Sequence, residues 1–231
     1  DPGRPEARTV TTAWPTTVAE AEAEQDRLRA LVDLTDAPAP PRTVAGLDVA
    51  YADGDDRLVA AVVVLDAVTL EPVDEAVTIG RPAFPYVPGL FAFREIPALL
   101  DALDRLGTRP DLLVCDGHGL AHPRRFGLAC HLGVLTGLPA LGVGKTHLTG
   151  EWTTPGERRG DASPITLDGV TVGTVLRTQD RVRPVFVSPG HRISVAGATA
   201  QVLALAPRFR LPETTRAADH ACRAALAGRT H

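Results

Sequence analysis

The pattern of apolar and polar residues divides the chain into a strand-rich beginning and a region where strands and helices alternate. Residues 44–52, 57–66 and 72–80 are apolar segments of strand length, and the turn sequence DGDD at residues 53–56 predicts a hairpin between the first two. We therefore predict that the sheet opens with three consecutive antiparallel strands.

After a loop at residues 81–89, the predicted elements alternate between helix and strand. The apolar spacing indicates a helix over residues 90–106, a short buried strand over 111–115 and another over 139–143. Between those two strands we predict a helix that begins after Pro123. Its apolar face consists of Phe126, Ala129, Cys130 and Val134. This alternation is typical of parallel strands connected by helices.

The N-terminal segment is polar and rich in proline. Residues 17–33 have the spacing of an amphipathic helix, with Leu28, Leu31 and Val32 on its apolar face, and a Pro-rich linker follows at residues 37–42. We see no apolar stretch typical of a signal peptide in this segment.

The C-terminal part of the chain adds further elements to the sheet. We predict a hairpin between residues 170–176 and 185–187, and helices over 194–205 and 213–226. The whole pattern predicts an α/β fold, in which a mixed sheet of antiparallel hairpin strands and parallel strands is flanked by helices. We expect one domain over residues 1–231, into which residues 1–42 lead as a helix and a linker.

Composition narrows the class of protein. The 231 residues are 44% hydrophobic, which is enough for one sizeable core, and contain no apolar run long enough to span a membrane. Three cysteines without CxxC spacing indicate a reduced compartment, and we expect a cytoplasmic protein. A net charge of −4 argues against a general nucleic-acid-coating protein, although a local basic groove can still bind a strand.

Lysine usage is unusual. The chain has 24 Lys and Arg residues, and Lys145 is its single lysine. Lysine carries a compact point charge, whereas arginine carries a planar fork that is always charged. One lysine in such a chain can survive by chance, or it can occupy a position where arginine cannot do the same work.

Three carboxylates occupy positions suited to a metal site. Asp48 lies inside an apolar strand and faces away from Leu47 and Val49, and Asp116 ends a buried strand. Glu95 lies in the helix that follows the loop at residues 81–89. A buried carboxylate is costly unless it is paired or bound to metal. Oxygen ligands without cysteine favour Mg²⁺ or Mn²⁺ over Zn²⁺. Together they predict a phosphoryl-transfer centre, although each carboxylate singly can be a solvated or capping residue.

Four motifs carry a resemblance to a known family. They are VAGLDVAYA from residue 44, PYVPGLFAFRE from residue 85, DGHGLAHPRRFGLACHLG from residue 116 and GVGKTHL from residue 142. In this order they resemble the endonuclease V family. The resemblance implies a ribonuclease H-like fold and a Mg²⁺-dependent endonuclease, in which Mn²⁺ can substitute. It also implies a DNA-repair role, with cleavage of the second phosphodiester bond 3′ to inosine or another deaminated purine, leaving 3′-hydroxyl and 5′-phosphate ends.

The resemblance also implies roles for individual residues. Asp48 and Asp116 match the principal metal ligands, and Glu95 matches the active-site glutamate, which we count as a third ligand. His122 and Lys145 match the other polar active-site positions. Lys145 would neutralise charge on the scissile phosphate or position water, and His122 would orient water or contact phosphate.

Pro85, Tyr86, Val87 and Pro88 resemble the wedge of the family. Two prolines stiffen a loop that presents an aromatic face, which can fill the gap left by an extruded nucleotide. A tyrosine packed beneath a Pro-rich loop is the alternative.

The base pocket is expected beside this wedge. Glycine allows backbone N–H and C=O groups to approach a ligand closely. We assign Gly89, Gly117 and Gly119 to reading the O6 acceptor and N1–H donor of hypoxanthine, with Leu90 and Leu120 as apolar walls.

The chain departs from the family pattern at two positions. Gly144 replaces the usual alanine, a change we expect to be tolerated, and the family sequence EPTR appears as ETTR at residues 213–216. The sequence SPGH at residues 188–191 also resembles a family segment, and sequence alone assigns it no role.

Three other functions compete with this interpretation of the sequence. GVGKT is not a nucleotide-binding P-loop, because the long helix that should follow that motif is broken within a few residues by LTGEWTTPG at residues 148–156. A hydrolase with metal held by His118, His122, His131 and Asp116 is one alternative, and a non-catalytic inosine-binding protein is another. We expect a monomer that acts on DNA; the sequence leaves open RNA as substrate and one or two metal ions.

Overall fold

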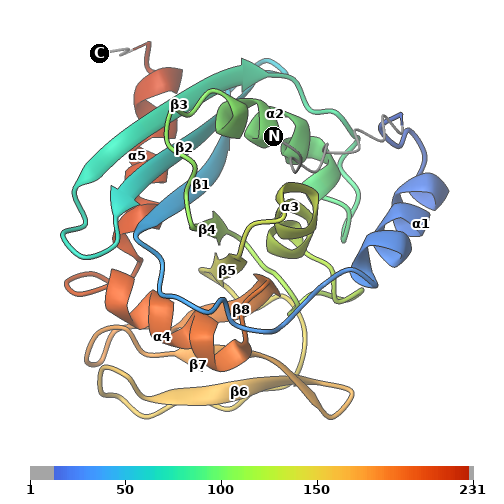
Figure 1. Cartoon of the computed structure of the whole chain (residues 1–231). Coiled ribbons are helices and arrows are strands. Elements are labelled where there is room, and N and C mark those ends of the chain that lie inside the picture. The colour runs from blue at the N-terminus through green and yellow to red at the C-terminus, as the bar shows by residue number, and fades with distance from the viewer. Residues whose placement is uncertain (1–12, 229–231) are drawn as a thin grey trace, which may run out of the picture.

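The computed structural model describes residues 13–228, and one eight-stranded sheet runs through them (Figure 1). The strand order is β3-β2-β1-β4-β5-β8-β7-β6. The strands are β1 Thr43–Tyr51, β2 Leu58–Asp66, β3 Pro72–Gly80, β4 Leu112–Asp116, β5 Ala140–Gly144, β6 Ala162–Leu167, β7 Val170–Leu176 and β8 Val185–His191.

The sheet combines antiparallel and parallel pairing as predicted. β1, β2 and β3 form a consecutive antiparallel meander, and β4 and β5 lie parallel to β1. β8 pairs antiparallel with β5, and the predicted hairpin of β7 with β8 is present. Parallel neighbours end at the same edge of a sheet, so the last residues of β1, β4 and β5 meet there.

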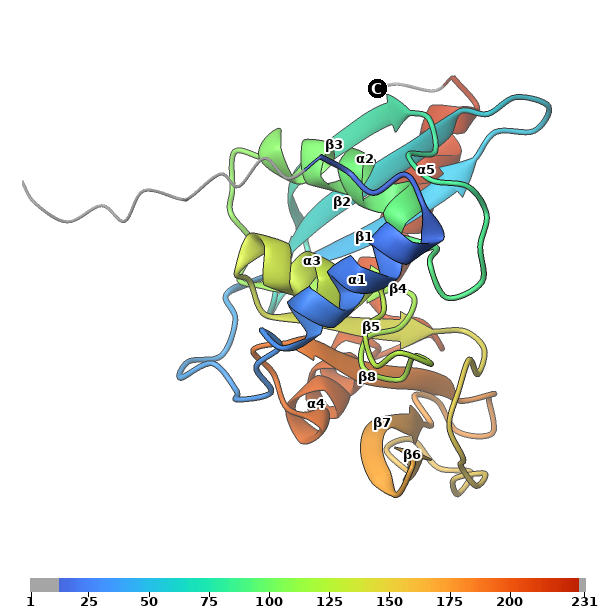
Figure 2. The same cartoon turned by 90° about the vertical axis from the view of Figure 1, so that its right-hand side faces the viewer.

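Helices cover both faces of the sheet (Figures 1 and 2). α5 and α4 pack on one face, whereas α2 and α3 pack on the other, and α1 lies outside α3. The helices are α1 Val18–Arg29, α2 Ala92–Asp104, α3 Leu128–Thr136, α4 Val195–Leu205 and α5 Glu213–Leu226. The predicted α/β class and mixed sheet are therefore confirmed.

Burial explains why the strands read differently in the sequence. β2 is a continuous apolar run because it lies between helices on both faces, and eight of its nine residues are buried. β3 is an edge strand, in which Val73, Glu75 and Ile79 are exposed whereas Ala76 and Thr78 are buried.

α2 continues through an internal proline. Pro97 has no N–H to give to the carbonyl of Phe93 four residues earlier. The indole Nε1 of Trp14 donates to that carbonyl instead, at 3.0 Å. This bond satisfies the orphaned acceptor and attaches the segment before α1 to α2.

The structure corrects several sequence predictions. α3 begins at Leu128 and not after Pro123, because Arg125 has a φ of 53°, which a right-handed helix cannot contain. β6 was not predicted; it is an edge strand, where Pro164 needs no ladder hydrogen bond. Leu31 is 56% exposed because α1 ends at Arg29, before the predicted apolar face is complete.

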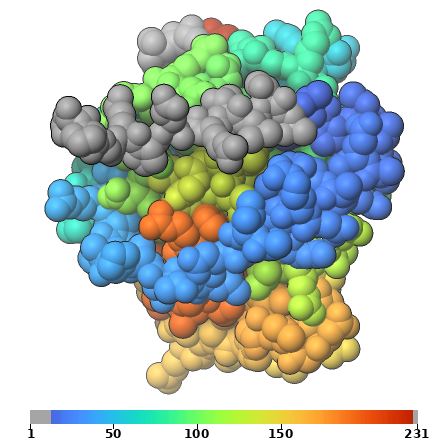
Figure 3. All heavy atoms as spheres, turned by 45° about the vertical axis from the view of Figure 1, so that its right-hand side comes forward, coloured from blue at the N-terminus to red at the C-terminus, as the bar shows by residue number. Residues whose placement is uncertain are grey.

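The chain after α1 returns to the sheet along the surface. In Figure 3 this segment, in lighter blue, runs beside the orange segment that begins α4. Asp36 accepts hydrogen bonds from the backbone N–H and the hydroxyl of Ser194 at 2.7 and 2.9 Å. Across residues 13–228 the structure contains no helix with both the length and the apolar character needed to cross a bilayer.

Candidate active site

Asp48 and Asp116 lie side by side where the parallel pairing of β1 with β4 ends. β1 and β4 are in register up to the pair Leu47 and Cys115, so the next residue on each strand is an aspartate. Leu47 and Cys115 point into the core beneath α2, and the aspartates therefore point to the opposite face, beneath α5. The strand ladder itself brings the two carboxyl groups into contact.

The two carboxyl groups disturb each other electrostatically. Burial and the neighbouring Asp116 carboxylate raise the pKa of Asp48 to about 7. Lys145, just after β5, places its Nζ 2.9 Å from Oδ2 of Asp116. Burial opposes protonation of Lys145, but the hydrogen bond to Asp116 and the nearby carboxylates raise the pKa of the ammonium above its ordinary value. The cluster therefore attracts positive charge.

Glu95 lies across the same strand ends, on α2. Its Oε1 accepts a hydrogen bond of 3.0 Å from the hydroxyl of Tyr51. Burial, opposed by this bond and reinforced by the charge of Asp116, raises the pKa of Glu95 to about 7. Burial and the Glu95 charge in turn raise the pKa of Tyr51 to about 12.

The predicted triad of metal ligands is only partly assembled. Within residues 13–228, no three His, Cys, Asp or Glu side chains are placed so that together they could hold a metal ion. Asp48 and Asp116 are brought together, whereas Glu95 turns to Tyr51. The pair still fits Mg²⁺, which usually binds one or two carboxylates and fills its remaining positions with water and substrate phosphate.

A further carboxylate, Asp219 on α5, was missed by sequence reasoning. Its charge contributes to the raised pKa of Lys145, and it also pairs with Arg223 one helical turn further on. In the sequence it is one acid on an amphipathic helix, so no local signal separates it from a solvated residue. Only the packing of α5 on β1 brings it to the cluster.

A cavity of about 530 Å³ opens beside the carboxylates. Its lining residues come from the end of β1, the loop before α2, α2 itself, and the loops after β4 and β5. They are Tyr51, Tyr86, Gly89, Phe91, Ala92, Arg94, Glu95, Asp116, Gly117, His118, His122, Gly127, Leu128 and Leu148. Asp116 and Glu95 thus belong to both the cavity and the acidic cluster.

The apolar walls of this cavity differ from those predicted. Leu90 is buried against Phe84 and Phe93 beneath the loop and does not line the cavity. Leu120 is likewise absent from the lining and packs between Phe186 and Phe126. Phe91, Leu128 and Leu148 form the walls instead. In the turn at this point, the Leu90 N–H donates to the Val87 carbonyl. This turn directs the Leu90 side chain inward and leaves Phe91 at the cavity.

The three predicted glycines support the cavity in different ways. Gly89 and Gly117 line it, with φ of 83° and 146°, values that disfavour any side chain. Gly119 does not line the cavity. It lies so close to the carbonyl of Pro189 that a side chain there would overlap it. The N–H groups of Gly117 and Gly119 already donate to the Val143 carbonyl and the Ser188 hydroxyl. The predicted reading of a base by these two N–H groups therefore has no support from the structure.

The predicted wedge is exposed at the mouth of the cavity. Tyr86 is 72% exposed, and its ring packs 4.6 Å from that of Phe91. The guanidinium of Arg94 lies 5.7 Å from the Tyr86 ring and 5.4 Å from the Tyr51 ring. Pro85 and Pro88 flank the tyrosine and are also exposed. Tyr86 is therefore presented outward and is not packed beneath the loop. Val87, by contrast, is partly buried against the cluster around Phe84.

His118, His122 and His131 do not form the metal site of the alternative hydrolase. His131 is buried among Trp14, Phe93 and Phe126, and burial lowers its pKa to about 3. His122 uses both ring nitrogens in hydrogen bonds to backbone groups. The structure thus gives no support to the alternative of a histidine-ligated hydrolase.

The glycine at Gly144 has a structural explanation, whereas nothing in the structure explains the threonine that replaces proline at Thr214. A side chain at Gly144 would collide with the imidazole of His118, which lines the cavity, so glycine here makes room for that ring. Thr214 of ETTR is buried where its carbonyl approaches Gly46 of β1 so closely that only glycine fits.

SPGH supports the loop after β4. The Ser188 hydroxyl accepts from the Gly119 N–H at 2.8 Å, and the Pro189 carbonyl accepts from the Leu120 N–H at 2.8 Å. Gly190 lies so close to Ala129 of α3 that a side chain would overlap its backbone. His191 Nδ1 accepts from the N–H of Asp33 at 3.1 Å.

Comparison with known proteins agrees with this geometry. The sequence model of the endonuclease V family matches residues 26–220. Endonuclease V of Nocardia farcinica is 61% identical over 218 residues, which are 94% of this chain and 96% of the relative. The crystal structure of Streptomyces avermitilis endonuclease V superposes with a TM-score of 0.90 at 56% identity, covering 95% of this chain and 97% of that one.

A more distant structure has nucleic acid bound. Ciona intestinalis endonuclease V, in complex with a 24mer DNA containing an inosine followed by a ribo-adenosine, has a TM-score of 0.80 at 26% identity; the match covers 92% of this chain and 99% of that one. The fold is therefore ribonuclease H-like. The residues matched by the family model include every candidate from Asp48 to Asp219, and the chain belongs to the endonuclease V family of nucleases.

Proposed function

We propose that this protein binds inosine-containing nucleic acid and, with a divalent cation, hydrolyses the second phosphodiester bond 3′ to the lesion, in DNA repair. The observation that carries the proposal is Asp116, which lines a cavity large enough for a base and also contacts Asp48 and Lys145. The Ciona relative solved with inosine-containing DNA supports a nucleic-acid partner.

Asp48 and Asp116 would hold Mg²⁺, or Mn²⁺ in its place. The support is chemical: two carboxyl groups in contact raise the pKa of Asp48 to about 7, and a divalent cation between them would remove that repulsion. The cation would lower the pKa of the attacking water and stabilise charge on the leaving 3′-oxygen.

Other groups of the site act on the phosphate and on protons. Lys145, 44% exposed beside Asp116, provides a point charge for the scissile phosphate. Glu95, with a pKa raised to about 7, can accept a proton from water near neutral pH. Tyr51 holds the Glu95 carboxylate in place through its hydroxyl.

Base recognition would occur in the cavity. Tyr86 would enter the duplex at the gap left by the extruded base, and that base would stack among Phe91, Leu128 and Leu148. Extrusion costs a few kcal/mol and least at weak pairs, so inosine in a mismatch should be preferred.

The test uses end-labelled DNA and RNA strands that each carry one inosine, with adenine-containing strands as controls. Under single-turnover conditions with Mg²⁺, we expect one product that ends at the second bond 3′ to inosine. Asp48→Ala should slow cleavage about a thousandfold, because metal catalysis contributes several kcal/mol, while most binding remains. Equal cleavage of the control strands, or full activity of Asp48→Ala, would contradict the proposal.

A further inference from the structure

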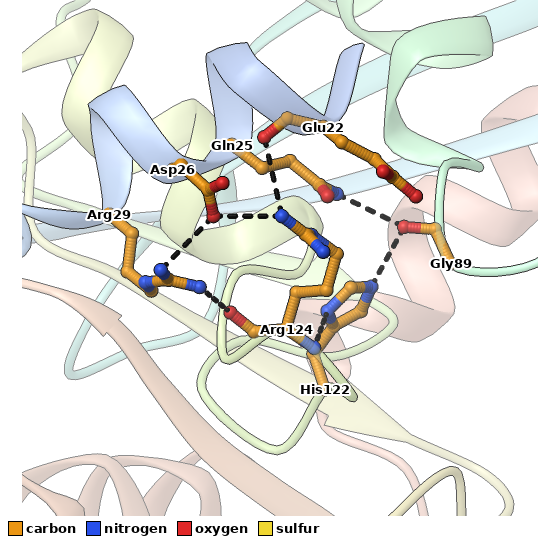
Figure 4. A network of polar contacts seen from close by, with 7 residues as sticks. All are labelled: Glu22, Gln25, Asp26, Arg29, Gly89, His122 and Arg124. Atoms are coloured by element: carbon orange, nitrogen blue, oxygen red, sulfur yellow. Dashed lines mark hydrogen bonds and ion pairs between the residues drawn. The ribbon is translucent and has the colours of Figure 1, made fainter. Parts of the chain in front are cut away.

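The carbonyl group of Gly89 receives hydrogen bonds from two side chains. Gln25 Nε2 of α1 and His122 Nε2 both lie 3.0 Å from this oxygen (Figure 4). Gly89 directly follows the wedge, lines the cavity and has a left-handed φ of 83°. Both lone pairs of its carbonyl are therefore used to hold the point where wedge and cavity meet.

The hydrogen bond at Nδ1 of His122 defines which ring nitrogen carries the proton. The Arg124 N–H donates to His122 Nδ1 at 3.1 Å, so Nδ1 is an acceptor and the ring proton is on Nε2, directed at Gly89. Burial also lowers the pKa of His122, which favours the neutral ring. With both nitrogens engaged, His122 has none left for water or phosphate.

Gln25 is an unusual residue at its position. It is 1% exposed, and among residues 13–228 its Oε1 has no hydrogen-bond partner. A buried polar atom without a partner costs free energy that an apolar side chain would avoid. Within the described part of the chain, the one hydrogen bond of this side chain is the bond to the Gly89 carbonyl.

Ion pairs attach α1, which carries Gln25, to the loop that carries His122. Asp26 of α1 accepts from Arg124 at 2.8 Å and pairs with Arg29 at 3.0 Å, and Arg29 donates to the Arg124 carbonyl at 2.9 Å. Figure 4 shows this network continuing from α1 through Arg124 to His122 and Gly89. α1 is thereby attached both to the wedge and to the loop after β4.

We propose that Gln25 is a positioning residue for base recognition, which together with His122 holds the Gly89 carbonyl and so keeps the wedge at the mouth of the cavity. Neither side chain needs to touch the phosphate for this role. The cleavage measurement below rests on the proposed function, whereas the exchange measurement does not.

The first test is amide hydrogen exchange of the free protein. Gln25→Met keeps the length of the side chain and removes the donor, and Gln25→Glu keeps the shape and replaces the donor with an acceptor. We expect exchange at residues 85–91 to become about fivefold faster in both variants, the effect of losing one hydrogen bond. Leu28→Ala is the control, because Leu28 anchors α1 on Phe126 and Cys130 without contacting Gly89.

The second test is cleavage of an inosine-containing strand. Gln25→Met should raise KM about fivefold and leave kcat unchanged, because it alters recognition and not the acidic cluster. Unchanged exchange at residues 85–91, faster exchange spread equally over the molecule as in Leu28→Ala, or a loss confined to kcat would each overturn the proposal. An inactive wild-type protein would overturn the proposed function, and the exchange measurement would still decide the role of Gln25.

Discussion

The two halves of the site are held together in different ways. The acidic half stands at the ends of β1 and β4, where backbone pairing alone brings Asp48 beside Asp116. The cavity half is made of loops, held by side chains from distant parts of the chain, such as Gln25 of α1 and Ser188 of β8. Substitutions in the acidic half should therefore change chemistry without changing shape, whereas the cavity half can lose its shape.

The halves also differ in their electrostatics. The acidic half concentrates like charges, and the pKa of Asp48 rises to about 7. The histidines of the cavity half are neutral, since burial lowers the pKa of His118 to about 4 and that of His122 below its ordinary value. The acidic half thus carries an electrostatic cost in stability, from like charges held together, that the cavity half does not carry.

Among substitutions outside Asp48 and Asp116, the largest effect should come from Lys145. Lys145→Ala should lower kcat about a hundredfold, the effect of removing one charged donor from a reacting centre. Lys145→Arg should recover little activity, because the guanidinium can fork onto Asp116 and compete with the cation. Single-turnover cleavage measures both variants. Full activity of Lys145→Arg would show that charge alone is needed.

A smaller effect should appear in stability. The pKa of Asp48 is 3.8 when unfolded and about 7 when folded, so the stability contributed by its bound proton is complete below pH 4 and is lost as pH rises to about 7. Without divalent ions, Asp48→Asn should therefore be more stable than wild type by about 2 kcal/mol at pH 8, allowing for partial solvent screening. Urea unfolding measures this difference.

The expected difference between Asp48→Asn and wild type shrinks toward pH 4, where both side chains are neutral. A difference that stays constant from pH 4 to pH 8 would mean that repulsion at the acidic half is not its cause. The same variant should lack metal-dependent cleavage.

The smallest effect should come from the wedge. Tyr86→Ala should weaken discrimination between inosine and control strands about tenfold, because one stacking contact is lost. The folded state should be unaffected, since the ring is 72% exposed. Competition binding to both strands gives the ratio. An equal loss of affinity for the two strands would argue against a wedge.

Much of the acidic half was predictable. An aspartate inside an apolar strand, another at a strand end and the single lysine all stand out in the sequence, and strand pairing is regular enough to bring them together. Asp219 was not predictable, because its role depends on how α5 lies on β1.

The cavity half was predictable only in outline. The motifs identified Tyr86, Gly89 and Gly117, but the prediction put Leu90 in the wall that Phe91 forms. In a loop, one local turn decides which of two adjacent side chains faces the cavity, and no period of two or 3.6 residues applies.

The sequence by itself determined the order of strands and helices except for β6, the mixed sheet and the motifs of the family, because periodic burial is recorded in the order of residues. Tertiary structure decided that Glu95 binds Tyr51, that His122 holds Gly89 and that α1 supports the wedge. These are contacts between segments far apart in the chain, and each depends on hydrogen-bond distances that only the packed fold defines.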